Sequence, residues 1–416
     1  MKKQIIFLMA ILAICNSALS QNWQQALNGR NVWSLARDAV NNIYAGGLTG
    51  SNSRIWKSTD GGGSWDTIYT GTGQTMWDFA FDQSGNIYVA NFSAGLLKST
   101  DNGTTFSTIP ISAFNNKNPQ GVECGSNGFV FVTTSTGFFR STNSGGTFTE
   151  TALTGLNCLP VIVDKDSSNI VYVGVTSAGG TGIGFYRSTD NGATFSNNLN
   201  PGKNGYKLAQ SLSGAVYMIT TTSPYNFDRS TDKGLTWTTL GNTSSGQRGV
   251  AVGYGSDIYT SGNGGVFKSS NGGSNFSNYN LAITTTPILY VEYDATARLF
   301  AGASGSANGG VWILTKQLTN LSGTSVSMPG KIILEQNYPN PFNPSTVIRF
   351  ELPERSNCNL RIFDTSGKLI SVLVNNVLNA GEYEYVLRAD DLPAGIYFYE
   401  LRTAAFSQTR KMIILK

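Results

Sequence analysis

The sequence predicts an all-β protein, namely a seven-bladed β-propeller followed by a small immunoglobulin-like β-sandwich. Three observations predict this fold. A short motif recurs six times, strand-like runs precede each copy, and the texture of the chain changes after a Ser-, Thr- and Gly-rich segment at residues 317–330. A repeat of about 40 residues with strand-like content is typical of propeller blades. We expect residues 317–330 to be a linker.

The six motif copies are short hairpins with nearly the same sequence: STDGGGSW, STDNGTTF, STNSGGTF, STDNGATF, STDKGLTW and SSNGGSNF. Successive third positions are 41, 42, 47, 42 and 39 residues apart and are occupied by Asp60, Asp101, Asn143, Asp190, Asp232 and Asn271. Three strand-like runs precede each copy and one follows it, which predicts a four-stranded blade. Because Asp or Asn can accept backbone N–H bonds across such a turn, we assign these six residues a structural role.

The arithmetic of the repeats predicts a seventh blade without a motif. Residues 288–314 repeat the first three strands of a blade, but no motif follows them. Residues 22–24 resemble the end of a motif with its fourth strand, and they directly precede the first blade. We therefore expect residues 21–316 to form a closed propeller with Trp23 beside the strand of Trp312. Such closure removes exposed sheet edges.

The motif copies resemble Asp-box repeats, also called BNR repeats. Such repeats occur in sialidases, xyloglucan-cleaving glycoside hydrolases, sortilin-type receptors and photosystem assembly propellers. The resemblance implies the propeller fold over the whole region of the repeats. It does not imply one activity, because a single fold hosts many functions.

Residues 331–416 form a separate module of short alternating strands and turns, which predicts a β-sandwich of about seven strands. Four segments resemble the type A C-terminal sorting domain of the type IX secretion system: NYPNPFNPST at 337–346, DTSGK at 364–368, LPAGIYFYEL at 392–401 and KMIILK at 411–416. The resemblance implies that the type IX machinery is a partner that carries the protein across the outer membrane of a gram-negative bacterium. The alternative is a stabilising sandwich that carries no address.

The first 20 residues have the pattern of a secretory signal peptide. Lys2 and Lys3 precede an apolar run over residues 5–14, and small residues end the segment at 18–20. A lipid attached to Cys15 is the alternative interpretation. No other stretch is apolar enough to cross a bilayer. We expect a secreted or cell-surface protein that passes through the periplasm.

Composition excludes several kinds of chemistry. The chain of 416 residues has no histidine, so Ser-His-Asp catalysis and histidine zinc sites are excluded. The formal charge is +4, or +2 without Lys2 and Lys3. This charge is too small to indicate binding to nucleic acid. We expect no metal and no cofactor. Cys124 and Cys158 either pair or remain buried thiols, and Cys358 is expected in a core strand.

Ligand binding is expected at the end of the central channel that lies opposite the motif turns. Trp33, Trp77 and Tyr206 occupy similar places before the second strand of their blades, with Arg248 and Tyr290 at or beside the equivalent place. Aromatic faces can hold sugars or peptides, and the alternative is that these rings plug a narrow channel.

Catalytic groups are scarce. Asp78 and Glu123 begin the inner strands of adjacent blades and are the carboxylate pair to test for glycosidase chemistry. The arginine cluster of sialidases is not recognisable. The run DKDSSN at 164–169 lacks the glycine and terminal glutamate of a calcium loop, which favours a solvated turn.

The preferred function is an exported, non-enzymatic propeller that binds a carbohydrate or protein ligand outside the cell. A glycoside hydrolase, sialidase-like or polysaccharide-cleaving, is the alternative. A structural or adhesion component of the cell surface is the third interpretation.

Overall fold

The structure is a computed structural model that describes residues 23–72, 75–176, 182–211, 214–221, 225–242, 246–252, 257–280, 283, 287–293, 299–305, 309–314, 321–324, 332–343, 345–354, 356–378, 381–389 and 392–415. Within these ranges every regular element is a β-strand except one short 3₁₀ helix, η1 (Ile111–Phe114). The prediction of an all-β protein is confirmed. The predicted signal peptide at 1–20 lies outside the described residues.

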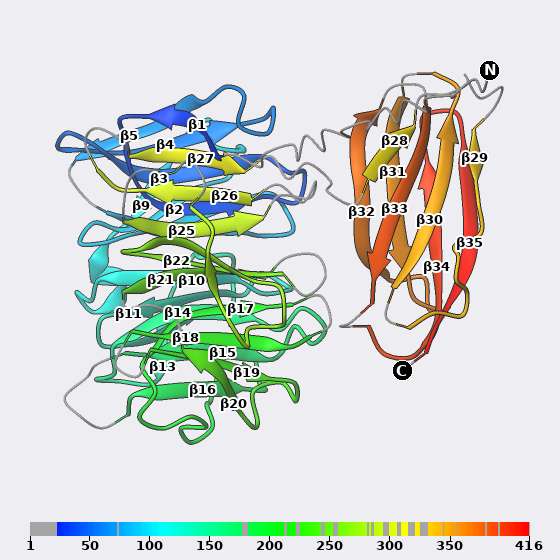
Figure 1. The fold of residues 1–416 in the computed structure, drawn as a ribbon. Helices are drawn as coiled ribbons and strands as arrows, with labels where there is room; N and C mark the ends of the chain where they lie inside the picture. Colours follow the sequence, from blue (N-terminus) through cyan, green and yellow to red (C-terminus); the bar gives the residue numbers. More distant parts are fainter. Residues whose placement is uncertain are drawn as a thin grey trace, which may run out of the picture.

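Seven small antiparallel sheets follow one another along residues 23–314 (Figure 1). We number them one to seven by the chain order of their inner strands. Sheets one to three contain β2 (Asn31–Arg37), β3 (Ile43–Thr49), β4 (Asn52–Ser58), β5 (Asp66–Thr72); β6 (Met76–Phe81), β7 (Ile87–Asn91), β8 (Gly95–Ser99), β9 (Ser107–Ile109); and β10 (Pro119–Cys124), β11 (Val130–Thr134), β12 (Gly137–Ser141), β13 (Thr149–Ala152).

The remaining four sheets repeat this order, and the last of them recruits the first strand of the chain. Sheets four to seven contain β14 (Cys158–Val163), β15 (Val171–Val175), β16 (Gly184–Ser188); β17 (Gly205–Gln210), β18 (Val216–Thr220), β19 (Asn226–Ser230), β20 (Thr238–Asn242); β21 (Gln247–Val252), β22 (Ile258–Gly262), β23 (Gly265–Ser269), β24 (Ser277–Asn278); and β25 (Ile288–Tyr293), β26 (Leu299–Ala303), β27 (Gly310–Leu314), β1 (Trp23–Asn28).

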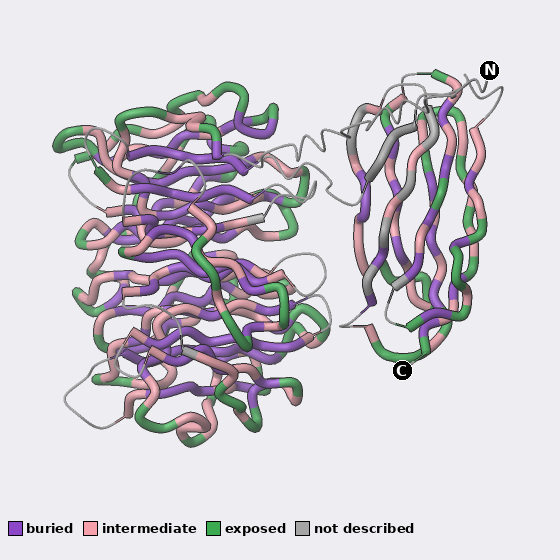
Figure 2. Tube along the Cα trace, in the orientation of Figure 1, coloured by how far each residue is buried: buried purple, intermediate pink, exposed green. Residues whose placement is uncertain are grey.

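The inner strands form a closed ring around a central channel. Each inner strand contacts the inner strand of the next sheet, and β25 contacts β2. Hydrophobic clusters fill the space between neighbouring sheets; Tyr172 and Phe185 of sheet four, for example, pack with Leu208 and Met218 of sheet five. Figure 2 shows the consequence: buried residues run along the strands, and exposed residues gather in the turns at the two ends.

Strand β1 closes the ring. It pairs antiparallel with β27, placing Trp23 opposite Leu314 and Gln25 opposite Trp312. The Trp23 side chain is 3% exposed, and its indole N–H donates to the carbonyl oxygen of Tyr279 at 2.9 Å. Trp23 therefore lies beside the strand of Trp312, as its position in the sequence predicts.

The six motif turns, residues 58–65, 99–106, 141–148, 188–195, 230–237 and 269–276, share one set of hydrogen bonds. In each turn the first serine Oγ accepts the N–H of a glycine four residues later at 2.7–2.9 Å. The Asp or Asn Oδ1 accepts the N–H four residues after it at 2.9–3.0 Å. Since Asn143 and Asn271 make the same bond, the geometry does not require a carboxylate charge.

The motif turns also join neighbouring sheets. Lys98 Nζ of sheet two donates to the carbonyl of Ser144 in the next motif turn at 2.7 Å. Gly234 has a φ of +82°, and a Cβ added there would lie 2.6 Å from the Phe185 ring of the preceding sheet. Only glycine fits this close approach. The corresponding glycine of every motif turn packs against the sheet before it, and the third motif turn is also hydrogen bonded to that sheet.

The turns between the first and second strands of the sheets lie at the same end of the ring as the motif turns. The N–H of Ser144 in the third motif turn donates to Gly128 in the β10–β11 turn at 2.8 Å, and the N–H of Asn191 donates to Asn169 in the β14–β15 turn at 2.9 Å. We call this end of the ring the motif face.

Sheet four departs from the expected four strands, because three of its strands are present in the described residues. The segment after the fourth motif turn nevertheless stays bonded to β16: the N–H of Ser196 donates to the Arg187 carbonyl at 2.8 Å, and the N–H of Leu199 donates to the Phe185 carbonyl at 2.9 Å. The Asn198 side chain adds two further bonds, since its Oδ1 accepts the Phe185 N–H at 3.2 Å and its Nδ2 donates to the Ile183 carbonyl at 2.6 Å.

The C-terminal module has two four-stranded antiparallel sheets packed around one core. The sheets contain β28 (Leu321–Thr324), β33 (Gly381–Arg388), β30 (Ser345–Leu352), β29 (Ile333–Leu334); and β32 (Leu369–Leu378), β31 (Ser356–Phe363), β34 (Gly395–Arg402), β35 (Ser407–Ile414). The described residues thus form eight strands where about seven were expected. The expected linker at 317–330 is wrong in part, because β28 pairs with β33.

The three cysteines of the described chain are free. Cys124 is half-buried, whereas Cys158 and Cys358 are buried. Cys358 lies in β31 within the sandwich core, where the sequence places it. Burial raises the pKa of the Cys124 and Cys158 thiols, so both are held in the protonated form.

Replacing Asp101 by alanine is expected to lower the melting temperature, because the N–H and hydroxyl of Thr105 lose their acceptor. Replacing it by asparagine, the residue of two natural copies, should restore most of the loss. Hydrogen bonds from Thr105 lower the pKa of Asp101 to about 2. The unfolded value is about 3.9, so this carboxylate stabilises the fold above that pH and loses its effect as the pH falls towards 2.

Thermal unfolding of the wild type and both variants at pH 7 and pH 2.5 measures these effects. The alanine variant should lose less on acidification than the wild type. An alanine variant that melts with the wild type at pH 7 would contradict the structural role of the motif.

Candidate functional site

The central channel is divided into two compartments. The upper compartment, of about 60 Å³, lies at the end opposite the motif face. The lower chamber, of about 800 Å³, is lined down to the β2–β3 and β6–β7 turns and to Asn102 of the second motif turn. The lower chamber therefore opens on the motif face.

A ring of seven side chains surrounds the upper compartment, one from each inner strand. Every inner strand has a register shift near its start, which leaves one residue unpaired, or two in β14, and the first unpaired residue lines the upper compartment. A bulge of this kind re-aims a side chain out of the ladder. The seven ring residues are Trp33, Trp77, Gln120, Leu159, Tyr206, Arg248 and Leu289.

Most of the predicted ligand-binding residues gather in this ring. Trp33, Trp77, Tyr206 and Arg248 occupy ring positions, and Tyr290 lies one residue past Leu289, which holds the seventh position. Gln120 and Leu159 were missed. Both residues lie at the equivalent place before the second strand of their sheets. The sequence analysis selected mainly aromatic residues at this place, and neither side chain is aromatic.

The ring is packed tightly. Arg248 Nη1 donates to the Tyr206 hydroxyl at 3.0 Å, and the Trp77 ring lies 5.6 Å from the Phe92 ring. The indole nitrogens of Trp33 and Trp77 are enclosed and have no hydrogen-bond partner among the described protein atoms. These two indole N–H groups are therefore not exposed to the channel. A compartment of about 60 Å³ is far smaller than the roughly 300–1,000 Å³ of ordinary ligand sites.

The Lys207 side chain lies across the channel and separates the two compartments. Its ammonium group lies 3.9 Å from the Asp78 carboxylate of sheet two and 4.3 Å from the centre of the Tyr290 ring of sheet seven. Asp78 also accepts the N–H of Val122 from sheet three at 3.3 Å. Lys207, Asp78 and Tyr290 line both compartments. These three residues form the floor of the upper compartment and the roof of the lower chamber.

Five acidic and three basic residues line the lower chamber, from six of the seven sheets and the turns that follow their inner strands: Arg37, Asp38, Asp78, Asp82, Glu123, Lys165, Lys207 and Glu292. Sheet six contributes apolar residues, Val250 to Val252. The larger cavity therefore lies at the motif face, whereas ligand binding at the opposite end stays a prediction. The side chains of the ring fill the end of the channel opposite the motif face, and the larger space lies further along the inner strands.

Burial governs the ionisation of the chamber. It raises the pKa of Glu123 to about 8, an effect that the charge of Asp78 reinforces and the N–H of Cys124 opposes. Burial also raises the pKa of Asp78, although Lys207 opposes the shift. The pKa of Lys165 is lowered by burial. The predicted carboxylate pair therefore lies in one chamber, and one member holds its proton near neutral pH.

The expectation of a solvated turn at 164–169 is wrong for Asp164. Its side chain is 2% exposed and accepts hydrogen bonds from the Tyr172 hydroxyl at 2.7 Å and from Gln210 Nε2 at 2.8 Å. A similar pairing joins Asp38 to Tyr44 in sheet one. No group of potential metal ligands is found within the described residues. Asp164 therefore has a structural role: it accepts hydrogen bonds from residues at the rim of the chamber.

Replacing Glu123 by glutamine tests the raised pKa. The unfolded value is about 4.3, so between this pH and about 8 the folded state keeps a proton that the unfolded chain releases. The wild type therefore loses stability relative to the variant as the pH rises through this window. The melting temperature of Glu123→Gln, measured relative to that of the wild type, should therefore rise between pH 5 and pH 8.

Glu150→Gln is the matched control. Hydrogen bonds and the charge of Lys117 lower the pKa of Glu150 against the effect of its partial burial. Its carboxylate stabilises the fold above about pH 4.3, so the control variant should lose stability at pH 8. A difference between Glu123→Gln and wild type that does not vary with pH would contradict the assignment.

The C-terminal module matches a known family. Residues 336–415 match the secretion system C-terminal sorting domain. This match indicates a protein that uses the type IX secretion machinery and is secreted or held at the cell surface. Within the described residues, no helix has the length and apolarity needed to cross a bilayer. No curated protein shows significant sequence similarity to this chain.

Solved β-propeller structures share the fold at low identity. The structure of YCF48 bound to D1 peptide is 15% identical, with a TM-score of 0.53, and the match covers 71% of this chain and 96% of that one. PorZ of Porphyromonas gingivalis, described as an essential surface component of the type IX secretion system, is 16% identical, with a TM-score of 0.52 and coverages of 93% and 59%.

A third similar structure is the extracellular domain of BT4673, a putative one-component system of B. thetaiotaomicron. It is 13% identical, with a TM-score of 0.55, and the match covers 95% of this chain and 59% of that one. This chain therefore spans less than two thirds of PorZ and of the BT4673 domain. Together these likenesses establish a β-propeller fold.

Proposed function

We propose that the protein is an exported, seven-bladed Asp-box propeller with an immunoglobulin-like sorting domain. Its propeller binds a carbohydrate or protein ligand outside the cell and catalyses no reaction. Seven sheets in a closed ring, the pairing of β1 with β27 and the common hydrogen bonds of the motif turns support the architecture. The sorting-domain match supports the location.

The lower chamber is the observation that supports binding. Its volume of about 800 Å³ lies in the range of ligand sites. Acidic and basic residues, Gln83, Gln210 and the apolar residues of sheet six line it together. A chamber open at one end suits the terminal unit of a longer molecule, such as the end of a glycan chain or of a peptide.

Binding is tested with the full chain on a glycan array and against a library of extracellular peptides. Lys207→Met removes the roof of the chamber and its charge, and should weaken binding about tenfold or more, as expected for a lost hydrogen bond to a charged group. Lys411→Met, on the exposed edge of the sandwich, is the control and should bind like the wild type. A ligand that binds both variants equally would place its site outside the chamber.

A glycoside hydrolase is the second candidate. Asp78 and Glu123 line one chamber, and the raised pKa of Glu123 suits a general acid that must carry a proton near neutral pH. If this candidate is right, the full chain should release reducing sugar from a polysaccharide, and Glu123→Gln should abolish release while substrate still binds. Binding without measurable release by the wild type would contradict the hydrolase and favour the binding protein.

Export is tested by deleting residues 321–416, which include all eight sandwich strands. The propeller should still fold, because in the described residues the sandwich has its own hydrophobic core. With the N-terminal segment intact, the truncated chain should cross the inner membrane and remain in the periplasm. Fractionation of a host with the type IX machinery measures its location. Recovery of the truncated chain outside the cell in undiminished amount would overturn the address role.

A further inference from the structure

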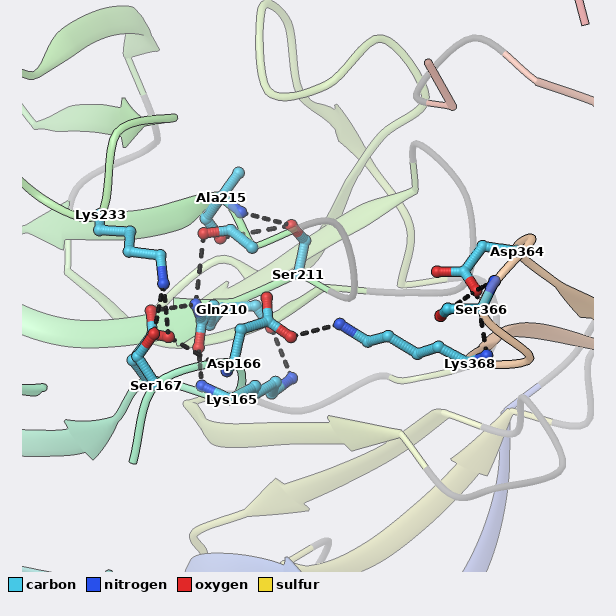
Figure 3. Close-up of polar contacts among 12 residues, drawn as sticks. Lys165, Asp166, Ser167, Gln210, Ser211, Ala215, Lys233, Asp364, Ser366 and Lys368 are labelled. Atoms are coloured by element: carbon cyan, nitrogen blue, oxygen red, sulfur yellow. Dashed lines mark hydrogen bonds and ion pairs between the residues drawn. The ribbon is translucent and has the colours of Figure 1, made fainter. Parts of the chain in front are cut away.

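The sandwich meets the propeller on the motif face. Lys368, in the turn between β31 and β32, forms an ion pair with Asp166 in the turn between β14 and β15 (Figure 3). Asp166 follows Lys165, which lines the lower chamber and donates from its Nζ to the Gln210 carbonyl at 2.7 Å. The contact therefore lies on the rim of the chamber.

Hydrogen bonds within each turn fix the residue that forms the ion pair. In the sandwich, Asp364 Oδ1 accepts the N–H of Ser366 at 2.8 Å and of Lys368 at 3.0 Å. In the propeller, the N–H of Asp166 donates to the buried Asp164 at 3.1 Å. Two preorganised turns lose little conformational freedom when they dock.

A second point of approach involves a different sheet of the propeller. Tyr385 of β33 is half-buried, and burial raises its pKa to about 12 with a further contribution from the negative charge of Asp257. Asp257 directly precedes β22 in sheet six and forms an ion pair with Lys268 at 3.0 Å. The sandwich thus approaches the rim at sheet four and at sheet six. Figure 1 shows it lying alongside the ring.

The connection between the two modules is short. Strand β27 ends at Leu314, and β28 of the sandwich begins at Leu321, so six residues separate them. At about 3.5 Å per residue these cannot span more than about 25 Å. In the other sheets the third strand leads into a motif turn, so β27 ends on the motif face. A short tether raises the effective concentration of the sandwich there, and a weak exposed ion pair then suffices to favour docking.

We propose that the sorting domain of the intact chain docks on the motif face over the mouth of the lower chamber and restricts access to it. Separation of the domain from this face opens the chamber. The sorting domain is then a cover for the chamber as well as an address. This inference concerns access to the chamber and holds whether the chamber binds a ligand or a substrate.

The test uses the full chain with a thiol placed inside the chamber. Ala209, a small half-buried residue of β17, lines the chamber and is replaced by cysteine in a chain that carries Cys124→Ser. Labelling by a bulky maleimide is followed in four chains: this parent, Lys368→Glu, Asp166→Lys, and the double variant with both charges exchanged. Small-angle X-ray scattering gives the maximum dimension of each.

Each single reversal should speed labelling about two- to fivefold and increase the maximum dimension, because like charges now face each other. The double variant should return to the slow rate and the compact shape, since the ion pair is restored with opposite polarity. Cysteine at the exposed Ser51, in the β3–β4 turn at the other end of the ring, is the control and should label at one rate in all four chains.

Equal labelling rates and equal dimensions in all four chains would overturn the proposal. A double variant that labels as fast as the single reversals would overturn the ion pair as the docking contact. Melting temperatures within the parent's range, with an unchanged control rate, establish that each variant is folded. A failed docking test leaves the binding and export tests of the proposed function unaffected.

Discussion

The pairing of β1 with β27 is the interaction on which the channel depends. Strands from opposite ends of a 292-residue segment complete one sheet, and Trp23 fills the gap between that sheet and sheet six. Without this pairing two sheet edges would be exposed, and the seven inner strands would have no fixed circumference. A fixed circumference keeps the two compartments at their different sizes and keeps Lys207 in reach of Asp78.

The same inner strands build a closed end and an open end. Near the start of each strand a bulge turns one large side chain into the ring, which fills the channel there. Further along the inner strands lies the lower chamber, where acidic and basic residues from different sheets line one cavity. The motif turns at this end fasten each sheet to its neighbour. The repeated structural element and the cavity are thus at the same end of the molecule.

The sequence could predict the repeat, the closing strand and the sorting module because each rests on local pattern: the motif spacing, the missing seventh motif and the matching segments at 337–416. It could not place the cavity. Which end of a channel is filled depends on bulges and side-chain volumes across seven strands, as Gln120 and Leu159 illustrate. The burial of Asp164 depends on Gln210 and Tyr172 from other strands. Such partnerships are not visible in any one repeat.

Hydrogen exchange of the full chain, followed residue by residue, tests the closure most directly. If β1 completes the ring, the amides of β1 that bond to β27 exchange as slowly as those between β26 and β27, because both open only when the propeller unfolds as a whole. Substitution of Trp23 by alanine then accelerates both sets together. Rapid exchange of β1 amides beside a protected β26–β27 pair would show that the ring stays intact without its closing strand, and would contradict the account.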